Sequence, residues 1–252
     1  MTTTIVLKNV SIEFPIYHAS ARSFKKHFLH LTTGGKLLAG KSQAITVRAL
    51  DNVSFTLQHG DRVGLIGHNG AGKSTLLRVL SRIYEPTTGS IIVKGKVSPL
   101  LDLLFGIEPE YTGYENIVTR GIMLGLTRKE ICSRIDSIAE FTGLGDYLSV
   151  PTRTYSAGMQ LRLAFGVATS VSPEILILDE VVGTGDLNFI EKAKIRLNEL
   201  IEKSSIVVLA THSFEMIKDV CNKVILLKEG KLEFLGDVAA GIAKYQETVK
   251  QQ

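Results

Sequence analysis

Cysteines and long apolar runs are scarce in this sequence. The two cysteines, Cys132 and Cys221, lie far apart and lack the spacing of metal ligands, so we interpret both as structural thiols of a cytosolic protein. No run approaches the roughly 18 to 20 apolar residues that cross a bilayer. The N-terminus also lacks an apolar signal segment. Any membrane role is therefore expected to be played through a partner.

Acidic residues are missing from one segment. Residues 15–50 contain six lysines or arginines and no aspartate or glutamate, whereas the whole chain has a net charge of +4. Apolar and basic side chains alternate there at helical spacing: Phe24, Phe28 and Leu31 against Arg22, Lys25 and Lys26. This pattern predicts a short basic amphipathic helix, either packed on its own domain or docked on a membrane surface or partner. Nucleic-acid binding is not indicated, because no basic and aromatic pattern continues elsewhere.

The remaining pattern predicts an α/β protein. With 252 residues and 44% hydrophobic content, the chain can form an ordinary globular core. Strand-like segments alternate with helical ones near the C-terminus, which is typical of a mostly parallel sheet. A helical region over 100–171, with Thr127 and Ser156 as predicted N-caps, interrupts this core. The predicted strands are 4–14, 48–57, 90–94, 175–178, 206–210 and 224–227, and the later helices are 188–201 and 213–220.

The stretch 67–75 has the pattern Gly-x-x-x-x-Gly-Lys-Ser between a strand-like and a helical segment. Glycines allow backbone N–H groups to close around phosphate oxygens, and the following helix adds its positive dipole end. We expect Lys73 to hold the β- and γ-phosphates of a nucleotide and Ser74 to bind Mg²⁺. The residues predicted to surround the phosphates, called the cradle below, are His68, Asn69, Gly70, Ala71, Gly72, Lys73, Ser74 and Thr75.

Two carboxylates follow the predicted buried strand 175–178. Asp179 is expected to reach Mg²⁺ directly or through water. Glu180 is expected to polarise the attacking water, a role that contributes roughly 10²- to 10⁴-fold in rate.

A second anion site is predicted at the start of a helix, in Tyr155-Ser156-Ala157-Gly158-Met159-Gln160. The Ser156 side chain, the Gly158 backbone and the helix dipole would form this site. Two phosphate sites in one subunit suggest that one of them serves a nucleotide bound by a neighbouring subunit. A P-loop kinase is an alternative function for the first site, but it would not account for the second anion site.

In their order, these motifs resemble an ATP-binding cassette (ABC) subunit over essentially the whole chain. The set comprises Walker A at 67–75, a signature-like 155–160, Walker B at 175–180, Asp186, and Thr211-His212 after a strand. The signature-like motif, which has the pattern Tyr-Ser-x-Gly-Met, and the stretch 112–116 are similar to the corresponding segments in the ATPase subunits of bacterial polysaccharide exporters. Those exporters move lipid-linked O-antigen, teichoic acid or capsule chains across the inner membrane.

The resemblance implies further site residues. His212 would contact the γ-phosphate and hold the water and Glu180 in register, and Asp186 would signal between subunits. Either Phe14 or Tyr17 would stack on adenine. Asp102 stands where the family usually has glutamine, and its implied role is metal contact or membrane coupling.

The resemblance also implies the architecture: one ABC nucleotide-binding domain over 1–252 with an antiparallel β subdomain. Its core would comprise about 1–99 and 172–252, its helical subdomain about 100–171, and its basic insert about 15–47. The implied function is an ATPase using ATP and Mg²⁺, a homodimer bound to an integral-membrane permease at the cytoplasmic face of the inner membrane. It would drive export of a lipid-linked glycan, and it is not expected to bind nucleic acid. The alternative is a soluble ABC-type ATPase acting on DNA or ribosomes.

Overall fold

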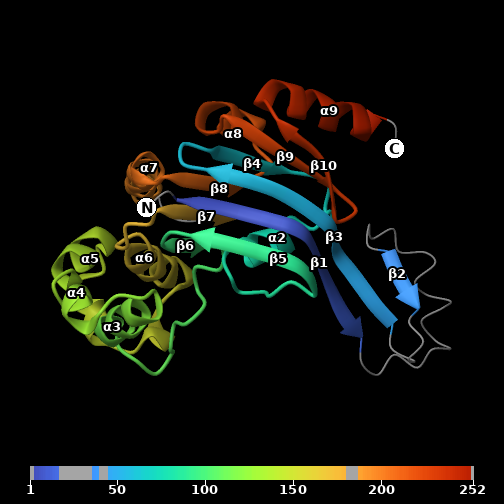
Figure 1. Ribbon diagram of the computed structural model, residues 1–252. Coiled ribbons are helices and arrows are strands. Elements are labelled where there is room, and N and C mark those ends of the chain that lie inside the picture. The colour runs from blue at the N-terminus through green and yellow to red at the C-terminus, as the bar shows by residue number, and fades with distance from the viewer. Residues whose placement is uncertain (1–2, 17–35, 40–44, 180–186, 251–252) are drawn as a thin grey trace. The chain divides into compact units, whose positions relative to one another are not determined.

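The structure, a computed structural model, describes residues 3–16, 36–39, 45–179 and 187–250 (Figure 1). The chain forms two compact units. The first comprises residues 1–95, 177–179 and 205–252, and the second comprises residues 96–176 and 180–204. The predicted basic helix and Tyr17 lie outside the described residues.

An antiparallel sheet of order β2-β3-β1-β5 belongs to the first unit. Its strands are β1 (Thr4–Ile16), β2 (Lys36–Ala39), β3 (Ile45–Gln58) and β5 (Thr88–Lys94). Asn9 has a positive φ of 50° at a register shift of β1, and its backbone N–H donates to Ser54 Oγ at 2.7 Å. This bulge keeps Leu7 and Val10 both buried although they are three residues apart. The strands predicted at 4–14, 48–57 and 90–94 are confirmed and longer, while β2 was not predicted.

The second sheet has six strands in the order β10-β9-β4-β8-β7-β6. Strand β4 is parallel to β8 and β9, and β10 is antiparallel to β9. Buried apolar residues run without alternation through β4, β7 and β8, as expected of strands covered on both faces. The mostly parallel sheet is therefore confirmed. The strands are β4 (Arg62–Ile66), β6 (Val97–Leu100), β7 (Ile175–Asp179), β8 (Ile206–Ala210), β9 (Lys223–Lys228) and β10 (Lys231–Gly236).

Three helices of the described residues pack in the first unit. Helix α2 (Lys73–Leu80) contacts both β3 and β8, so it links the two sheets of this unit. Helices α8 (Phe214–Val220) and α9 (Val238–Lys250) pack on each other, and α9 lies along β9 and β10 (Figure 1). The Asp237 carboxylate caps α9 by accepting from two backbone N–H groups at 2.9 and 3.1 Å.

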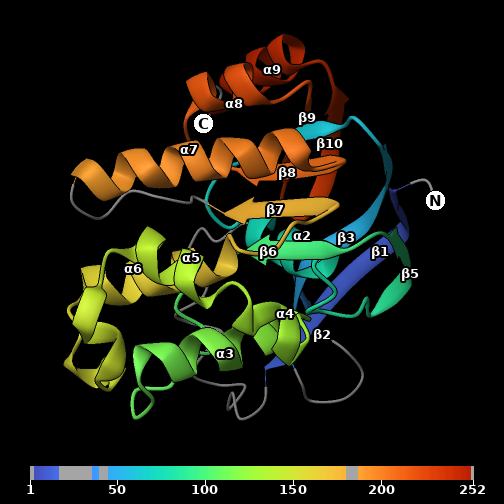
Figure 2. The same cartoon turned by 90° about the vertical axis from the view of Figure 1, so that its left-hand side faces the viewer.

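The second unit is mainly helical, and α3, α5 and α6 contact one another in it (Figure 2). Capping boxes begin α3 at Thr112 and α4 at Thr127. The hydrogen bonds from Thr112 lower the pKa of Glu115, as those from Thr127 lower the pKa of Glu130. The helical elements are α3 (Gly113–Met123), α4 (Arg128–Cys132), α5 (Ile135–Thr142), η2 (Gly145–Ser149), η3 (Thr152–Thr154), α6 (Ala157–Ala168) and α7 (Leu187–Lys203).

Helix α6 begins after Ser156 as predicted but ends at Ala168, three residues before the predicted end. The Thr169 and Ser170 hydroxyls donate to the carbonyls of Phe165 and Val167, at 2.8 and 2.7 Å. These local bonds compete with continued helix. Within the described ranges, no helix combines the length and apolarity that crossing a bilayer requires.

Candidate nucleotide-binding site

The predicted phosphate loop joins the end of β4 to the start of α2, the strand–loop–helix order that its chemistry requires. Gly72 has φ of +104°, and a Cβ there would lie 2.7 Å from the carbonyl oxygen of Ala49. Only glycine fits this position. Residues 68–72 form the loop, and Lys73, Ser74 and Thr75 form the first turn of α2.

The Lys73 ammonium lies on this loop. Its Nζ donates to the carbonyl oxygens of Gly67 at 2.7 Å and His68 at 3.1 Å. The first turn of α2 carries no acidic residue, so a fixed cation and the positive end of the helix dipole coincide there. This combination suits a phosphate group.

Ser74 and Asp179 are brought together by elements that are far apart in the sequence. Ser74 Oγ lies 3.4 Å from Asp179 Oδ2, at the carboxyl end of β7. A hydroxyl and a carboxylate are the hard oxygen ligands that Mg²⁺ prefers, usually together with phosphate oxygens and water. The described residues contain no cluster of three or more His, Cys, Asp or Glu side chains for a metal. The donor set therefore fits Mg²⁺ shared with a nucleotide rather than an all-protein metal cage.

His212 follows β8, the parallel neighbour of β4. Its side chain is exposed, and Ser213 caps the next helix by accepting from the N–H of Met216 at 3.3 Å. Because β4 and β8 run in the same direction, His212 and the phosphate loop leave the sheet at the same edge. The structure thus places His212 on the same edge as the loop.

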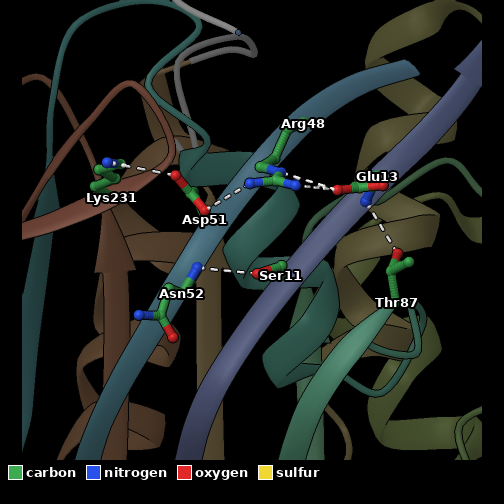
Figure 3. A network of polar contacts seen from close by, with 7 residues as sticks. All are labelled: Ser11, Glu13, Arg48, Asp51, Asn52, Thr87 and Lys231. Atoms are coloured by element: carbon green, nitrogen blue, oxygen red, sulfur yellow. Dashed lines mark hydrogen bonds and ion pairs between the residues drawn. The ribbon is translucent and has the colours of Figure 1, made fainter. Parts of the chain in front are cut away.

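A polar network supports the loop from the side of β1 and β3 (Figure 3). Arg48 lies between Glu13, at 2.6 Å, and Asp51, at 3.1 Å. Glu13 raises the pKa of Arg48 chiefly through its hydrogen bond. Lys231 Nζ approaches the second oxygen of Asp51 at 3.4 Å. The network therefore joins β1 and β3 to β10, whose preceding turn contacts the phosphate loop at Ala71.

The predicted second anion site lies in the second unit, at the start of α6. Ser156 Oγ accepts from the N–H of Met159 at 3.3 Å, which confirms Ser156 as the N-cap. Tyr155 is buried, and its hydroxyl donates to the carbonyl of Tyr147 at 2.5 Å. Burial raises the pKa of Tyr155. Ser156 and Ala157 are exposed beside this anchored tyrosine.

Comparison with known proteins assigns the chain with these features to a protein family. The ABC transporter family matches residues 50–183 of the chain. The O-antigen export system ATP-binding protein RfbE of Yersinia enterocolitica is 47% identical, over 90% of this chain and 95% of that protein. The chain belongs to the ABC transporter family.

Other relatives and structures agree with this assignment. The ABC ATPase is 34% identical to the teichoic acids export protein TagH of Listeria innocua, over 98% of its own length and 70% of that protein. A dimeric ATP-binding cassette with bound ADP and Pi matches 93% of the chain at 20% identity, with a TM-score of 0.67 and 98% of that structure covered. This match confirms the α/β cassette fold. The family assignment makes the chain an ATPase.

Several predicted residues of the ABC ATPase lie beyond what the structure describes. These are Glu180, Asp186 and Tyr17, and their roles stay predictions. Phe14 is described near the end of β1 and is 37% exposed. Its ring meets Tyr84 edge-on at 5.5 Å between centroids, and Arg78 lies 5.9 Å from the centre of the Tyr84 ring. Tyr84 was not predicted as a site residue, because sequence periodicity gives no signal for a pairing across 70 residues.

Asp102 lies after β6 in the second unit, whereas Ser74 and Asp179 belong to the first. Its carbonyl accepts from the N–H of Phe105 at 3.2 Å. The charge that interacts with its carboxylate is Arg120 on α3, which is only 5% exposed. Burial lowers the pKa of Arg120 to about 10, and Asp102 opposes this shift. The structure therefore links Asp102 to a buried cation, and its metal role stays a prediction.

Proposed function

We propose that this ABC ATPase drives the export of a lipid-linked, O-antigen-like polysaccharide across the inner membrane of a bacterium. The observation that carries the proposal is the 47% identity to an O-antigen export ATP-binding protein over 95% of that protein's length. The O-antigen export protein RfbB of Klebsiella pneumoniae is also 35% identical over its full length. These relatives are export proteins, and neither favours an ATPase acting on DNA or ribosomes.

In this proposal the phosphate loop binds ATP. Lys73 holds the β- and γ-phosphates, and the loop N–H groups hold the remaining oxygens. Ser74 and Asp179 would hold Mg²⁺, which neutralises charge on the β- and γ-phosphates when bound. Glu180 polarises the attacking water, and His212 keeps the water and Glu180 in register. Phe14 contacts adenine.

The site would be completed by a second copy of the chain. Ser156 and Gly158 of the partner subunit would contact the γ-phosphate bound by Lys73. Asp186 would signal the nucleotide state of the site between the two subunits. Among the described residues, a Cβ at Gly158 would meet only the Ser156 Oγ, at 3.9 Å. Packing within this described part of the chain therefore gives no reason for glycine at this position, whereas close approach of a second subunit's nucleotide would.

ATP-driven closure of the homodimer would then move an integral-membrane permease, and hydrolysis would reset it. The ATPase would be peripheral, on the cytoplasmic face of the membrane, and would handle the glycan only through the permease. Co-purification from detergent-solubilised membranes should recover a permease whose gene, when deleted, also stops glycan export.

Glu180→Gln tests the catalytic part of this proposal. It should stop steady hydrolysis and cell-surface glycan export while ATP binding persists, because the cradle is unchanged. Glu202→Gln, the same change at an exposed carboxylate of α7, is the matched control and should leave both unchanged. Normal export in cells that carry only the Glu180→Gln protein would contradict the proposal.

A further inference from the structure

Asn116 is a fully buried polar side chain on α3. Its Oδ1 accepts from the N–H of Glu108 at 2.8 Å, and its Nδ2 lies 3.0 Å from the carbonyl of the same residue. Nδ2 also lies 3.2 Å from the carbonyl of Tyr111 and 3.1 Å from that of Thr112. One side chain therefore fixes both ends of the segment 108–112.

Thr152 joins the same segment to a distant part of the chain. This buried residue donates from Oγ1 to the carbonyl of Glu108 at 2.9 Å, and its backbone N–H donates to the carbonyl of Tyr111 at 2.9 Å. Asn116 Nδ2 lies 3.3 Å from Thr152 Oγ1. The N–H of Arg153 donates to the carbonyl of Pro109 at 2.9 Å. Segments 108–112 and 151–153 are thus fastened together by side-chain and backbone bonds, although they are far apart in the sequence.

The bonds continue from Thr152 to the start of α6. The carbonyl of Thr152 accepts from the N–H of Tyr155 at 3.0 Å and from Gln160 Nε2 at 3.3 Å. Ser156 lies between these two donors and caps the helix. The position of Ser156 therefore depends on the carbonyl of Thr152.

On the other side, 108–112 continues the loop 101–107, which carries Asp102. In this loop the side chains of Leu104 and Phe105 are 44% and 77% exposed. The loop is held by turns, with the N–H of Ile107 donating to the carbonyl of Leu104 at 3.2 Å, and Ile107 packs on the helical core. A displacement of this loop would reach 108–112 directly through the backbone.

We propose that Asn116 and Thr152 are positioning residues that join the loop 101–112 to Ser156 as one hydrogen-bonded piece. A movement of the loop is then passed to Ser156 rather than absorbed between them. The inference rests on the proposed function for the contact of Ser156 with the partner subunit's nucleotide. This join, the set of hydrogen bonds between segments 108–112 and 151–153, is a property of the single subunit. It can therefore be measured without that contact.

The chain offers a matched pair of variants. Thr152→Val removes a hydroxyl whose bond joins residues 44 positions apart. Thr169→Val makes the same change at an equally buried site of the same unit, where the hydroxyl bonds locally to the carbonyl of Phe165 at 2.8 Å. Each variant loses the hydrogen bond that its hydroxyl donates, and Thr152→Val also loses the 3.3 Å contact with Asn116 Nδ2. Thr152→Val should therefore lose at least as much stability as Thr169→Val. Thr152→Ser restores the hydroxyl and serves as the rescue.

Amide hydrogen exchange of the full chain, without nucleotide, measures the join. In Thr152→Val the amides of Glu108, Thr152 and Arg153 should exchange roughly five- to tenfold faster, as loss of one hydrogen bond implies. They should be unchanged in Thr169→Val and restored in Thr152→Ser. Unchanged exchange at these amides in Thr152→Val overturns the proposal.

ATP-driven dimerisation, measured by size in the Glu180→Gln background, tests the effect on Ser156. Thr152→Val should require roughly five- to tenfold more protein to dimerise, with the nucleotide affinity of the monomer unchanged, whereas Thr169→Val should dimerise like its parent. Equal losses in the two variants would show a general stability effect and overturn the positioning role. If the parent itself stays monomeric with ATP, the two-subunit site is wrong, and the exchange result still decides whether the join exists.

Discussion

The backbone N–H of Gly230 donates to the carbonyl of Ala71 at 3.0 Å, so the turn between β9 and β10 holds the phosphate loop. The carbonyl of Gly230 in turn accepts from the N–H of Asp51 at 2.9 Å. Asp51 also pairs with Arg48 and Lys231 (Figure 3). A residue outside every nucleotide motif therefore ties the loop to the polar network on β3.

Gly230→Ala should weaken nucleotide binding. Gly230 has φ of +76°, and a Cβ would lie 2.7 Å from the backbone oxygen of Ala49. The positive φ alone costs about 1–2 kcal/mol for alanine, and the clash with backbone must move the turn and with it Ala71. We expect at least a tenfold loss of ATP affinity in a titration, together with a lower free energy of unfolding.

Gly60→Ala is the matched control. Gly60 has φ of +90° in the same unit, but a Cβ there would meet no atom of the described residues within 4 Å. It should show the cost of the positive φ in urea unfolding and no change in ATP affinity. Equal ATP affinity in the two variants would show that the turn does not hold the loop in its binding conformation.

Short-range signals in the sequence predicted much of the local structure of this protein. The phosphate loop, the Thr127 capping box and the Ser156 cap are each set by residues within a few positions, and the structure confirms their local geometry. Buried apolar runs likewise predicted β7 and β8, because strands covered on both faces need no alternation.

Contacts between distant segments could not be predicted in this way. The pairing of Phe14 with Tyr84, and of Asn116 with Thr152, depends on how sheets and helices pack. An asparagine within a helical pattern is ordinarily interpreted as exposed, and only the tertiary structure shows that Asn116 is a buried hub. The burial of Arg120 beside Asp102 was missed for the same reason.

Tyr84→Ala should weaken ATP binding if Phe14 contacts adenine, because Tyr84 supports the Phe14 ring edge-on. An aromatic pair contributes about 0.5–1.5 kcal/mol, which predicts a loss of roughly two- to tenfold in affinity. Tyr84→Phe retains the ring and should bind ATP normally. Inorganic triphosphate, which has no base, should bind all three proteins alike, and a loss there would assign the effect to the phosphate loop instead.

Arg120→Met should stabilise the isolated subunit. Among the described residues, Arg120 Nη1 has no hydrogen-bond partner although it is buried, and such a donor costs about 1–3 kcal/mol. A folded pKa of about 10, below the ordinary value of an arginine, means that the charged form is the disfavoured one. The cost is complete below pH 10 and falls as the pH rises above it.

The gain from Arg120→Met in urea unfolding should therefore be larger at pH 7 than at pH 10.5. Arg153→Met, at an exposed arginine paired with Glu110, should show little gain at either pH. A destabilised Arg120→Met protein at pH 7 would mean that the guanidinium is well paired, and would contradict the interpretation of Nη1 as an unsatisfied buried donor.

Lys73→Ala and Ser156→Arg should separate the two halves of the proposed site. Lys73→Ala should weaken nucleotide binding to the monomer by roughly ten- to a hundredfold, since bonds to charged groups contribute about 1.5–3 kcal/mol. Ser156→Arg should leave monomer binding unchanged and block dimer closure, because its bulk and charge would lie against the neighbour's nucleotide. In the Glu180→Gln background, a mixed dimer with one variant on each subunit has one composite site with both defects and one with neither. It should therefore retain one tightly bound ATP, while neither homodimer retains any. If Ser156→Arg lowers the nucleotide affinity of the monomer as much as Lys73→Ala does, the site lies within one subunit and the head-to-tail arrangement is wrong.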